Sequence, residues 1–154
     1  MKRASLLTKE IRARLIANGK AGRQLDHVPV VKVIDPGSPA TWLFTELRPD
    51  DPDMLYGLIH DVRNEQTPEL GYVSLTRLSS DYGRLSEPLR RDPDFAPRYP
   101  VSVYRTAARL IGRITCEPET LYLVATSLHI RPVVTAIPHP ALKSRRTRKR
   151  PTEA

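Results

Sequence analysis

The densest group of residues that could do acid–base or metal chemistry lies between Glu46 and Glu69. This segment holds seven acidic residues against two basic ones, and its first four carboxylates are Glu46, Asp50, Asp51 and Asp53. Hard divalent cations prefer carboxylate oxygens, so one hypothesis is a small metal-dependent hydrolase or nuclease-like enzyme that uses residues 46–69. However, the segment lacks the pattern of a calcium loop, and its prolines favour a turn whose aspartates bond their own backbone. We therefore favour a solvated acidic turn, and predict no metal site and no cofactor.

The other reactive residue types are scattered along the chain. The dipeptide His60-Asp61 is typical of metal-dependent phosphohydrolases, but the remaining histidines do not supply the further ligands in a recognisable pattern. His27 is expected to cap or pack. Cys116 is the single cysteine, which excludes an internal disulfide, and Arg113 three residues before it could lower its thiol pKa slightly. The sequence has neither a Gly-x-Ser-x-Gly elbow nor a glycine-rich phosphate loop, which disfavours ATP, NAD and serine-hydrolase functions.

The segment from Pro68 to Tyr72 is the most distinctive local pattern. Gly71 indicates a positive φ, a close approach of another chain, or a β-bulge. Trp42 and Tyr72 would line a cleft if their strands pair, and the alternative is that Trp42 belongs to the core. The candidate residues of such a ligand cleft are Lys32, Trp42, Glu46, Asp61, Glu69 and Tyr72.

The formal net charge of +8 is concentrated near the C-terminal end of the sequence. Without residues 143–154, the chain keeps 19 basic and 16 acidic residues, a net charge of +3. Six cations neutralise up to about six phosphates, which predicts DNA or RNA binding with a salt slope of about −5 and little sequence specificity. The alternative is a tail that only aids solubility. The candidate nucleic-acid-binding residues are Lys143, Arg145, Arg146, Arg148, Lys149 and Arg150.

Helix and strand patterns alternate along the part of the chain that must position these residues. Strands are expected over Val28–Ile34, Ala40–Leu47, Met54–His60 and Leu70–Ser74. Helices are expected over Lys9–Asn18, Leu75–Asp81 and Val103–Arg113, with Thr8, Ser74 and Ser102 as N-caps and with Gly19 and Gly83 ending the first two. We therefore predict an α+β fold: a small, mostly antiparallel sheet with two or three packed helices, a Pro-rich extension and a basic C-terminal tail.

Three segments are expected in the domain organisation. Residues 1–114 form the α+β domain, and residues 143–154 form a disordered basic tail. Between them lies a Pro-rich extension, residues 115–142, whose β-prone runs Leu121–Ile130 and Val133–Ile137 form added strands or pack loosely. The longest uncharged runs are 11 residues, too short to span a bilayer, and the apolar stretch near the N-terminus is too short for a signal peptide. A cytoplasmic protein with no membrane partner is predicted.

Several local patterns in the first three-quarters of the chain carry a family resemblance. They are Leu6–Arg12, Ala17–Gly19, Asp26–Lys32, Ala40–Leu43, Thr45–Leu47, Asp51–Asp53, Gly57-Leu58 and Pro68–Leu75. With these patterns the chain resembles the bacterial domain-of-unknown-function family 2958 (DUF2958) over residues 1–114. The resemblance implies one compact domain carried by plasmids and integrated conjugative elements, and it transfers no activity.

Two hypotheses about function follow from the sequence. The favoured one is a non-enzymatic accessory module of a mobile element that binds a protein partner, or DNA or RNA through the basic tail. The alternative is the metal-dependent hydrolase or nuclease-like enzyme described above. We favour the first because the sequence carries no catalytic motif.

Overall fold

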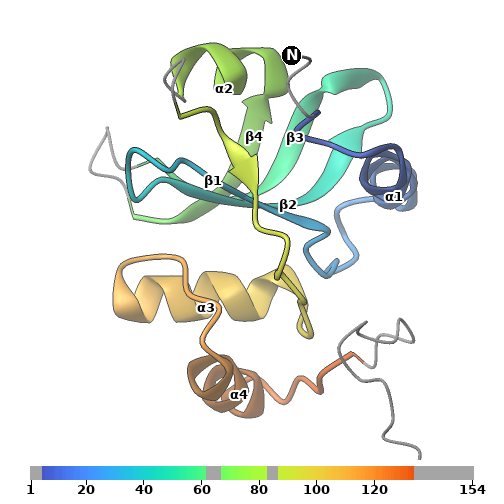
Figure 1. Ribbon diagram of the computed structural model, residues 1–154. Coiled ribbons are helices and arrows are strands. Elements are labelled where there is room, and N and C mark those ends of the chain that lie inside the picture. Colours follow the sequence, from blue (N-terminus) through green and yellow to red (C-terminus); the bar gives the residue numbers. More distant parts are fainter. Residues whose placement is uncertain (1–4, 62–66, 83–86, 134–154) are drawn as a thin grey trace, which may run out of the picture.

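A five-stranded antiparallel sheet with helices on both faces forms the fold (Figure 1). The computed structural model describes residues 5–61, 67–82 and 87–133. The strands are β1 (Val31–Ile34), β2 (Thr41–Arg48), β3 (Asp51–His60), β4 (Glu69–Ser74) and β5 (Arg90–Arg91), in the order β4-β3-β2-β1-β5. The helices are α1 (Lys9–Ala21), α2 (Leu75–Asp81), α3 (Val101–Ile111) and α4 (Pro118–Ser127). The predicted α+β class is confirmed, with four helices in the described ranges where two or three were expected.

The sheet separates two hydrophobic cores, one on each face. Helices α1 and α2 cover one face, and α3 and α4 lie on the other (Figure 1). Because side chains alternate along a strand, Trp42 and Phe44 of β2 enter the first core, whereas Leu43 enters the second. Trp42 is 1% exposed and meets the Tyr82 ring edge-on at 4.7 Å between ring centroids. Trp42 is therefore a core residue.

A β-bulge at Thr45 interrupts this alternation in the central strand. Phe44 pairs with Gly57 and Glu46 pairs with Tyr56, so Thr45 is the extra residue. Its carbonyl oxygen accepts a hydrogen bond from Asn18 Nδ2 of α1 (2.9 Å), and its hydroxyl donates to the Tyr56 carbonyl (3.2 Å). Beyond the bulge the facing is inverted, which places Glu46 on the α3 face.

Gly71 does not form a β-bulge, although a bulge was one of the three interpretations of its sequence pattern. It pairs regularly with Gly57, and its φ is not positive. The close approach occurs at Gly57 instead, where an added Cβ would lie 2.0 Å from the Leu43 carbonyl oxygen.

Gly19 does not end the first helix, so that prediction is wrong. Helix α1 continues to Ala21 and ends at Gly22, whose φ is 100°. Gly19 instead allows α1 to lie against β2, because a Cβ there would be only 1.9 Å from the Leu47 carbonyl oxygen. The predicted N-cap is confirmed: the Thr8 hydroxyl accepts a hydrogen bond from the Ile11 N–H (3.1 Å). Helix α2 also begins as predicted, with Ser74 as its N-cap.

Helix α3 is capped from a distant part of the chain. It begins at Val101, two residues before the predicted start, so Ser102 is not its N-cap. The Asp26 carboxylate accepts hydrogen bonds from the Ser102 N–H (3.1 Å) and from the Ser102 hydroxyl. The Val101 N–H donates to the His27 carbonyl (2.9 Å). The loop after α1 thus joins the two faces of the sheet.

Residues Leu121–Ile130 do not form a strand, which corrects the β-prone interpretation. Helix α4 begins with Pro118, a residue favoured in the first turn because it has no N–H to satisfy there. Leu121 and Val124 are buried in the core shared with α3. Gly83, residues 134–137 of the second β-prone run, and the basic tail lie outside the described residues.

The two paired glycines of β3 and β4 give a test of this packing. Gly57→Ala should lower the free energy of unfolding by about 3 kcal/mol, because the new methyl group overlaps the β2 backbone. Gly71→Ala should change it by less than about 1 kcal/mol, because its Cβ would meet only Ile59 Cδ1 at 3.7 Å. Urea unfolding of both variants measures the difference, and equal effects would contradict this packing.

Candidate functional site

Three side chains form a polar and aromatic row across the α3 face of the sheet. Glu46 of β2 pairs with Tyr56 of β3, and Tyr56 pairs with Tyr72 of β4. We call these three residues the Glu46 row. The neighbouring row, which starts at Leu43, packs against α3 and α4. Tyr72 is 37% exposed, so the Glu46 row extends from the buried centre of the sheet to its surface.

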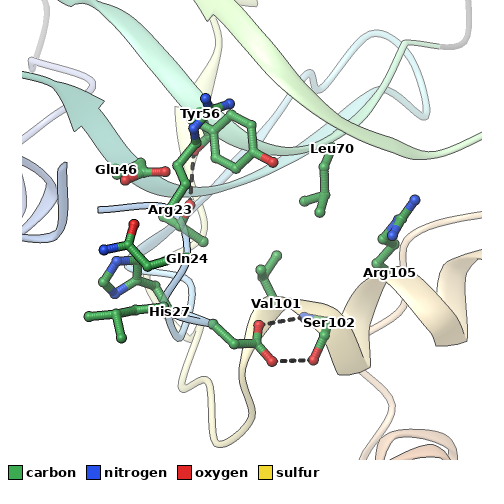
Figure 2. Close-up of a pocket in the computed structure, with 12 residues that line it drawn as sticks. Arg23, Gln24, His27, Glu46, Tyr56, Leu70, Val101, Ser102 and Arg105 are labelled. Carbon is green, nitrogen blue, oxygen red and sulfur yellow. Dashed lines mark hydrogen bonds between the residues drawn. The ribbon is translucent and has the colours of Figure 1, made fainter. Parts of the chain in front are cut away.

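A pocket of about 150 Å³ opens over two members of this row, Glu46 and Tyr56 (Figure 2). It lies between the sheet, the loop after α1 and the first turns of α3. Tyr56 and Leu70 line it from the sheet, and Val101 and Arg105 line it from α3 (Figure 2). The loop after α1, which Asp26 fastens to α3, forms the remaining wall.

Glu46 is the chemically unusual residue of the pocket. Its side chain is 3% exposed, and within the described residues it makes no hydrogen bond or ion pair. Burial raises the pKa of its carboxyl group, and the nearby charges of His27 and Arg23 oppose this increase. Buried carboxylates are normally paired. Glu46 therefore offers an unused acceptor to the pocket.

The two tyrosines of the row are in contact with each other and with arginines. The ring centroids of Tyr56 and Tyr72 are 4.9 Å apart. The Arg23 guanidinium carbon lies 5.3 Å from the Tyr56 ring centroid and 5.1 Å from the Tyr72 ring centroid. The Arg48 guanidinium carbon lies 5.6 Å from the Tyr72 ring centroid. These distances fit cation–π contacts. Arg48 is also bound to Asp50 at 2.8 Å, whereas Arg23 makes no ion pair with any residue that the structure describes.

Arg105 of α3 lines the pocket, and it shares the Glu69 carboxylate with Arg109. Glu69 accepts a hydrogen bond from Arg109 (2.8 Å) and lies 3.5 Å from Arg105 Nη2. These two cations lower the pKa of the Glu69 carboxyl group. Arg105 Nε is buried and has no acceptor.

Three of the six predicted cleft residues come together. Glu46 and Tyr72 share one row, and Glu69 is joined to the pocket through Arg105. Trp42 lies in the core on the other face of the sheet, so it does not form a cleft with Tyr72. Asp61 follows the end of β3 where His60 pairs with Thr41, at the opposite end of β2 from Glu46.

Lys32 belongs to a different place on the same face. Its ammonium group lies 3.3 Å from the Asp92 carboxylate, next to Cys116. Burial raises the pKa of the Cys116 thiol, contrary to the slight lowering that the sequence suggested. A cavity of about 410 Å³ adjoins this thiol, with Tyr99 and Tyr104 in its lining. A thiol with a raised pKa is a weak nucleophile at neutral pH.

Three acidic residues of segment 46–69 bind different partners in the structure. Asp50 pairs with Arg48, Asp53 accepts hydrogen bonds from the start of α2, including the Thr76 N–H (3.0 Å), and Glu69 pairs with α3. Among the described residues, no three His, Cys, Asp or Glu side chains are grouped as a metal site would require. The alternative of a metal-dependent hydrolase therefore finds no converging carboxylates within residues 46–61 and 67–69, the described part of this segment.

Arg23, Tyr56 and Arg105 line the pocket but were not among the cleft residues predicted from the sequence. Tyr56 precedes Leu58 by two positions and so shares its face, a signal that strand alternation alone provides. Arg23 and Arg105 have no such signal, because the loop and helix that carry them meet through the tertiary hydrogen bonds of Asp26 and His27 to the start of α3.

The unpaired Glu46 carboxylate should leave a measurable pH dependence of stability. Its pKa in the folded state is raised above the ordinary value of 4.5, so the folded state retains the proton to a higher pH than the unfolded state. Stability relative to Glu46→Gln should therefore fall as the pH rises from about 4 to 7, leaving the variant more stable by about 1 kcal/mol. Urea unfolding across this range measures it.

Glu69→Gln is the matched control with the opposite sign. The folded-state pKa of Glu69 is lowered, so the wild-type advantage over this variant is present above the unfolded-state pKa and is lost as the pH falls. A difference between wild type and Glu46→Gln that does not vary with pH would contradict the raised pKa of Glu46.

Comparison with known proteins places the chain in a family. The model of the family described as "Protein of unknown function (DUF2958)" matches residues 6–115, which include the whole Glu46 row and all of α3. No curated protein and no solved structure matches the chain. In the described ranges, no helix is long and apolar enough to cross a membrane. The chain belongs to the DUF2958 family.

Proposed function

We propose that the chain is a non-enzymatic accessory protein of a bacterial mobile element that binds single-stranded nucleic acid. The observation that carries this proposal is the pair of tyrosines flanked by arginines beside a pocket. Proteins that bind single strands combine aromatic rings, on which bases stack, with cations that contact the phosphates. Tyr72 is the exposed ring, and Arg23 and Arg48 are the adjacent cations.

The charge around the tyrosines is consistent with this role. Arg109 and Arg105 share the single carboxylate of Glu69, which leaves one positive charge in excess there. Arg23 makes no ion pair within the described residues. A strand that stacks on Tyr72 would therefore have cations on both sides for its phosphates.

The basic tail supplies a second, sequence-independent contribution. Its six cations can contact phosphates anywhere on a strand, while the tyrosine pair holds the bases. The mobile-element context comes from the family resemblance, and it fits an accessory role. A protein partner is the competing occupant of the same surface, and the tests below separate the two.

The exposed tyrosine should be needed for binding to a single strand. Tyr72→Ala should weaken the binding of a labelled oligothymidine by about 10- to 100-fold, the usual effect of removing one stacking ring. Tyr122→Ala is the matched control, because Tyr122 is 60% exposed on α4, away from the arginines. Fluorescence anisotropy measures both. Equal affinities for the two variants would contradict this proposal and favour a protein partner.

The basic tail should account for most of the salt dependence. Replacing its six Lys and Arg residues by Gln in the full-length chain should make the slope of log K against log salt less negative by about 4 on a single strand. Arg23→Ala should change the slope by about 1, and Arg14→Ala on the outer side of α1 should leave it unchanged. An unaltered slope after the six replacements would show that the tail does not contact phosphates.

A further inference from the structure

The buried carboxylate of Glu46 lies in the wall of the pocket without a partner. Glu46 is 3% exposed, and it makes no hydrogen bond or ion pair within the described residues. Arg105 Nε is enclosed by protein atoms, whereas the Glu46 oxygens are not fully covered. Leaving a buried carboxylate unpaired is costly. A molecule that enters the pocket and donates hydrogen bonds to Glu46 would remove this cost.

Most other polar side chains of the pocket already use their donors within the protein. These donors are Gln24 Nε2 to the Ala21 carbonyl (3.3 Å), His27 Nε2 to the Gly22 carbonyl (2.9 Å), the Thr45 hydroxyl to the Tyr56 carbonyl (3.2 Å) and the Ser102 hydroxyl to Asp26. The acceptors that remain include both Glu46 oxygens and the Gln24 amide oxygen. The pocket therefore favours an occupant that is rich in donors and poor in acceptors.

The cations of the lining do not exclude a further cation beside Glu46. Arg23 lies over the two tyrosine rings of the Glu46 row and does not bond Glu46. Arg105 is paired with a carboxylate outside the lining. With His27 neutral, the formal charges of the lining balance, two arginines against Asp26 and Glu46. A positive group at Glu46 thus gains a close attraction from an unpaired carboxylate.

The size and walls of the pocket fit the end of a long side chain. A cavity of about 150 Å³ is large enough for benzene, and a planar guanidinium group is smaller than that ring. Tyr56, Leu70 and Val101 give the pocket apolar surfaces (Figure 2), against which the methylene stem of an arginine would pack. The rest of the molecule that carries the side chain would stay outside.

We infer that the pocket binds the guanidinium group of an arginine side chain from a protein partner, which donates hydrogen bonds to Glu46. A guanidinium group has several N–H donors and no acceptor, and its planar fork matches the two oxygens of a carboxylate. Arginine is also enriched among the residues that dominate protein–protein binding energy.

Other donors fit the pocket less well. Every nucleobase carries acceptors beside its donors, and these would face the oxygens of Glu46 and Gln24. The ammonium group of lysine is a compact charge without the planar fork. The inference goes beyond the proposed binding of a single strand, because Tyr56 lines the pocket and Tyr72 does not.

Three capped tripeptides test the inference on the unaltered full-length chain. They are acetyl-Gly-Arg-Gly-amide and its counterparts with citrulline or lysine at the centre. The arginine peptide should bind about tenfold or more tightly than the citrulline peptide, whose similarly shaped side chain is neutral and carries an acceptor oxygen. It should bind about threefold or more tightly than the lysine peptide. Nuclear magnetic resonance titration of the labelled chain measures the affinities, and equal affinities for the three peptides would overturn the inference.

A pair of carboxylate variants assigns the contact to a residue. Glu46→Gln should remove most of the preference for arginine over citrulline. Asp50→Asn is the matched control, because it changes an exposed carboxylate outside the pocket lining, and it should keep the preference. Circular dichroism confirms that each variant is folded. A preference that survives Glu46→Gln, or one that Asp50→Asn also removes, would overturn the assignment to Glu46.

Two further arms distinguish the source of the arginine and separate this inference from the proposed function. The titration is repeated with the six basic tail residues replaced by Gln. An arginine peptide that binds only to this variant would show that the chain's own tail fills the pocket, and would overturn the assignment to a partner. A preference for arginine over citrulline in a chain that does not bind oligothymidine would support this inference and contradict the single-strand proposal. Binding of oligothymidine without that preference would overturn this inference alone.

Discussion

The hydrogen bond from Asn18 to the Thr45 carbonyl stabilises the β-bulge in β2, and the site depends on this bulge. The extra residue in β2 leaves this carbonyl without a partner in the sheet, and helix α1 supplies the donor at 2.9 Å. Gly19 makes that approach possible, since any side chain there would meet the Leu47 backbone. Without the bulge, strand alternation would direct Glu46 into the core beneath α1. With it, a carboxylate lies on the α3 face.

The second constraint is the Asp26 cap, which fixes the pocket wall. The loop from Gly22 onward leaves one face of the sheet and reaches the start of α3 on the other, where Asp26 accepts two hydrogen bonds from Ser102. Arg23 lies within this loop and packs over the tyrosines. The position of Arg23 over the sheet therefore depends on a helix that begins nearly eighty residues later in the sequence, so local patterns could not predict it.

Predictions from sequence succeeded where local chemistry decides the structure. The β-branched and apolar runs became strands, and the Thr8 and Ser74 hydroxyls capped helices as expected. They failed where tertiary packing decides. Gly19 resembles a helix terminator but serves a close helix–strand contact, and the apolar run after Pro118 forms a helix because α3 offers a face to cover. For the candidate site, Glu46, Glu69 and Tyr72 were predicted by residue type, but the residues that surround them in the structure are set by strand register and the bulge.

The unpaired Glu46 carboxylate is the feature of the structure that indicates a ligand. Three other polar side chains near the sheet have partners: Asp53 bonds the start of α2, Asn18 bonds the bulge, and Lys32 pairs with Asp92. Glu46 differs from these residues, because it is buried beside a pocket and makes no hydrogen bond or ion pair within the described residues. A leucine at position 46 would extend the apolar row of Leu43 at no such cost. A buried acceptor left unpaired beside a pocket is therefore most simply explained by a molecule that donates a hydrogen bond to it.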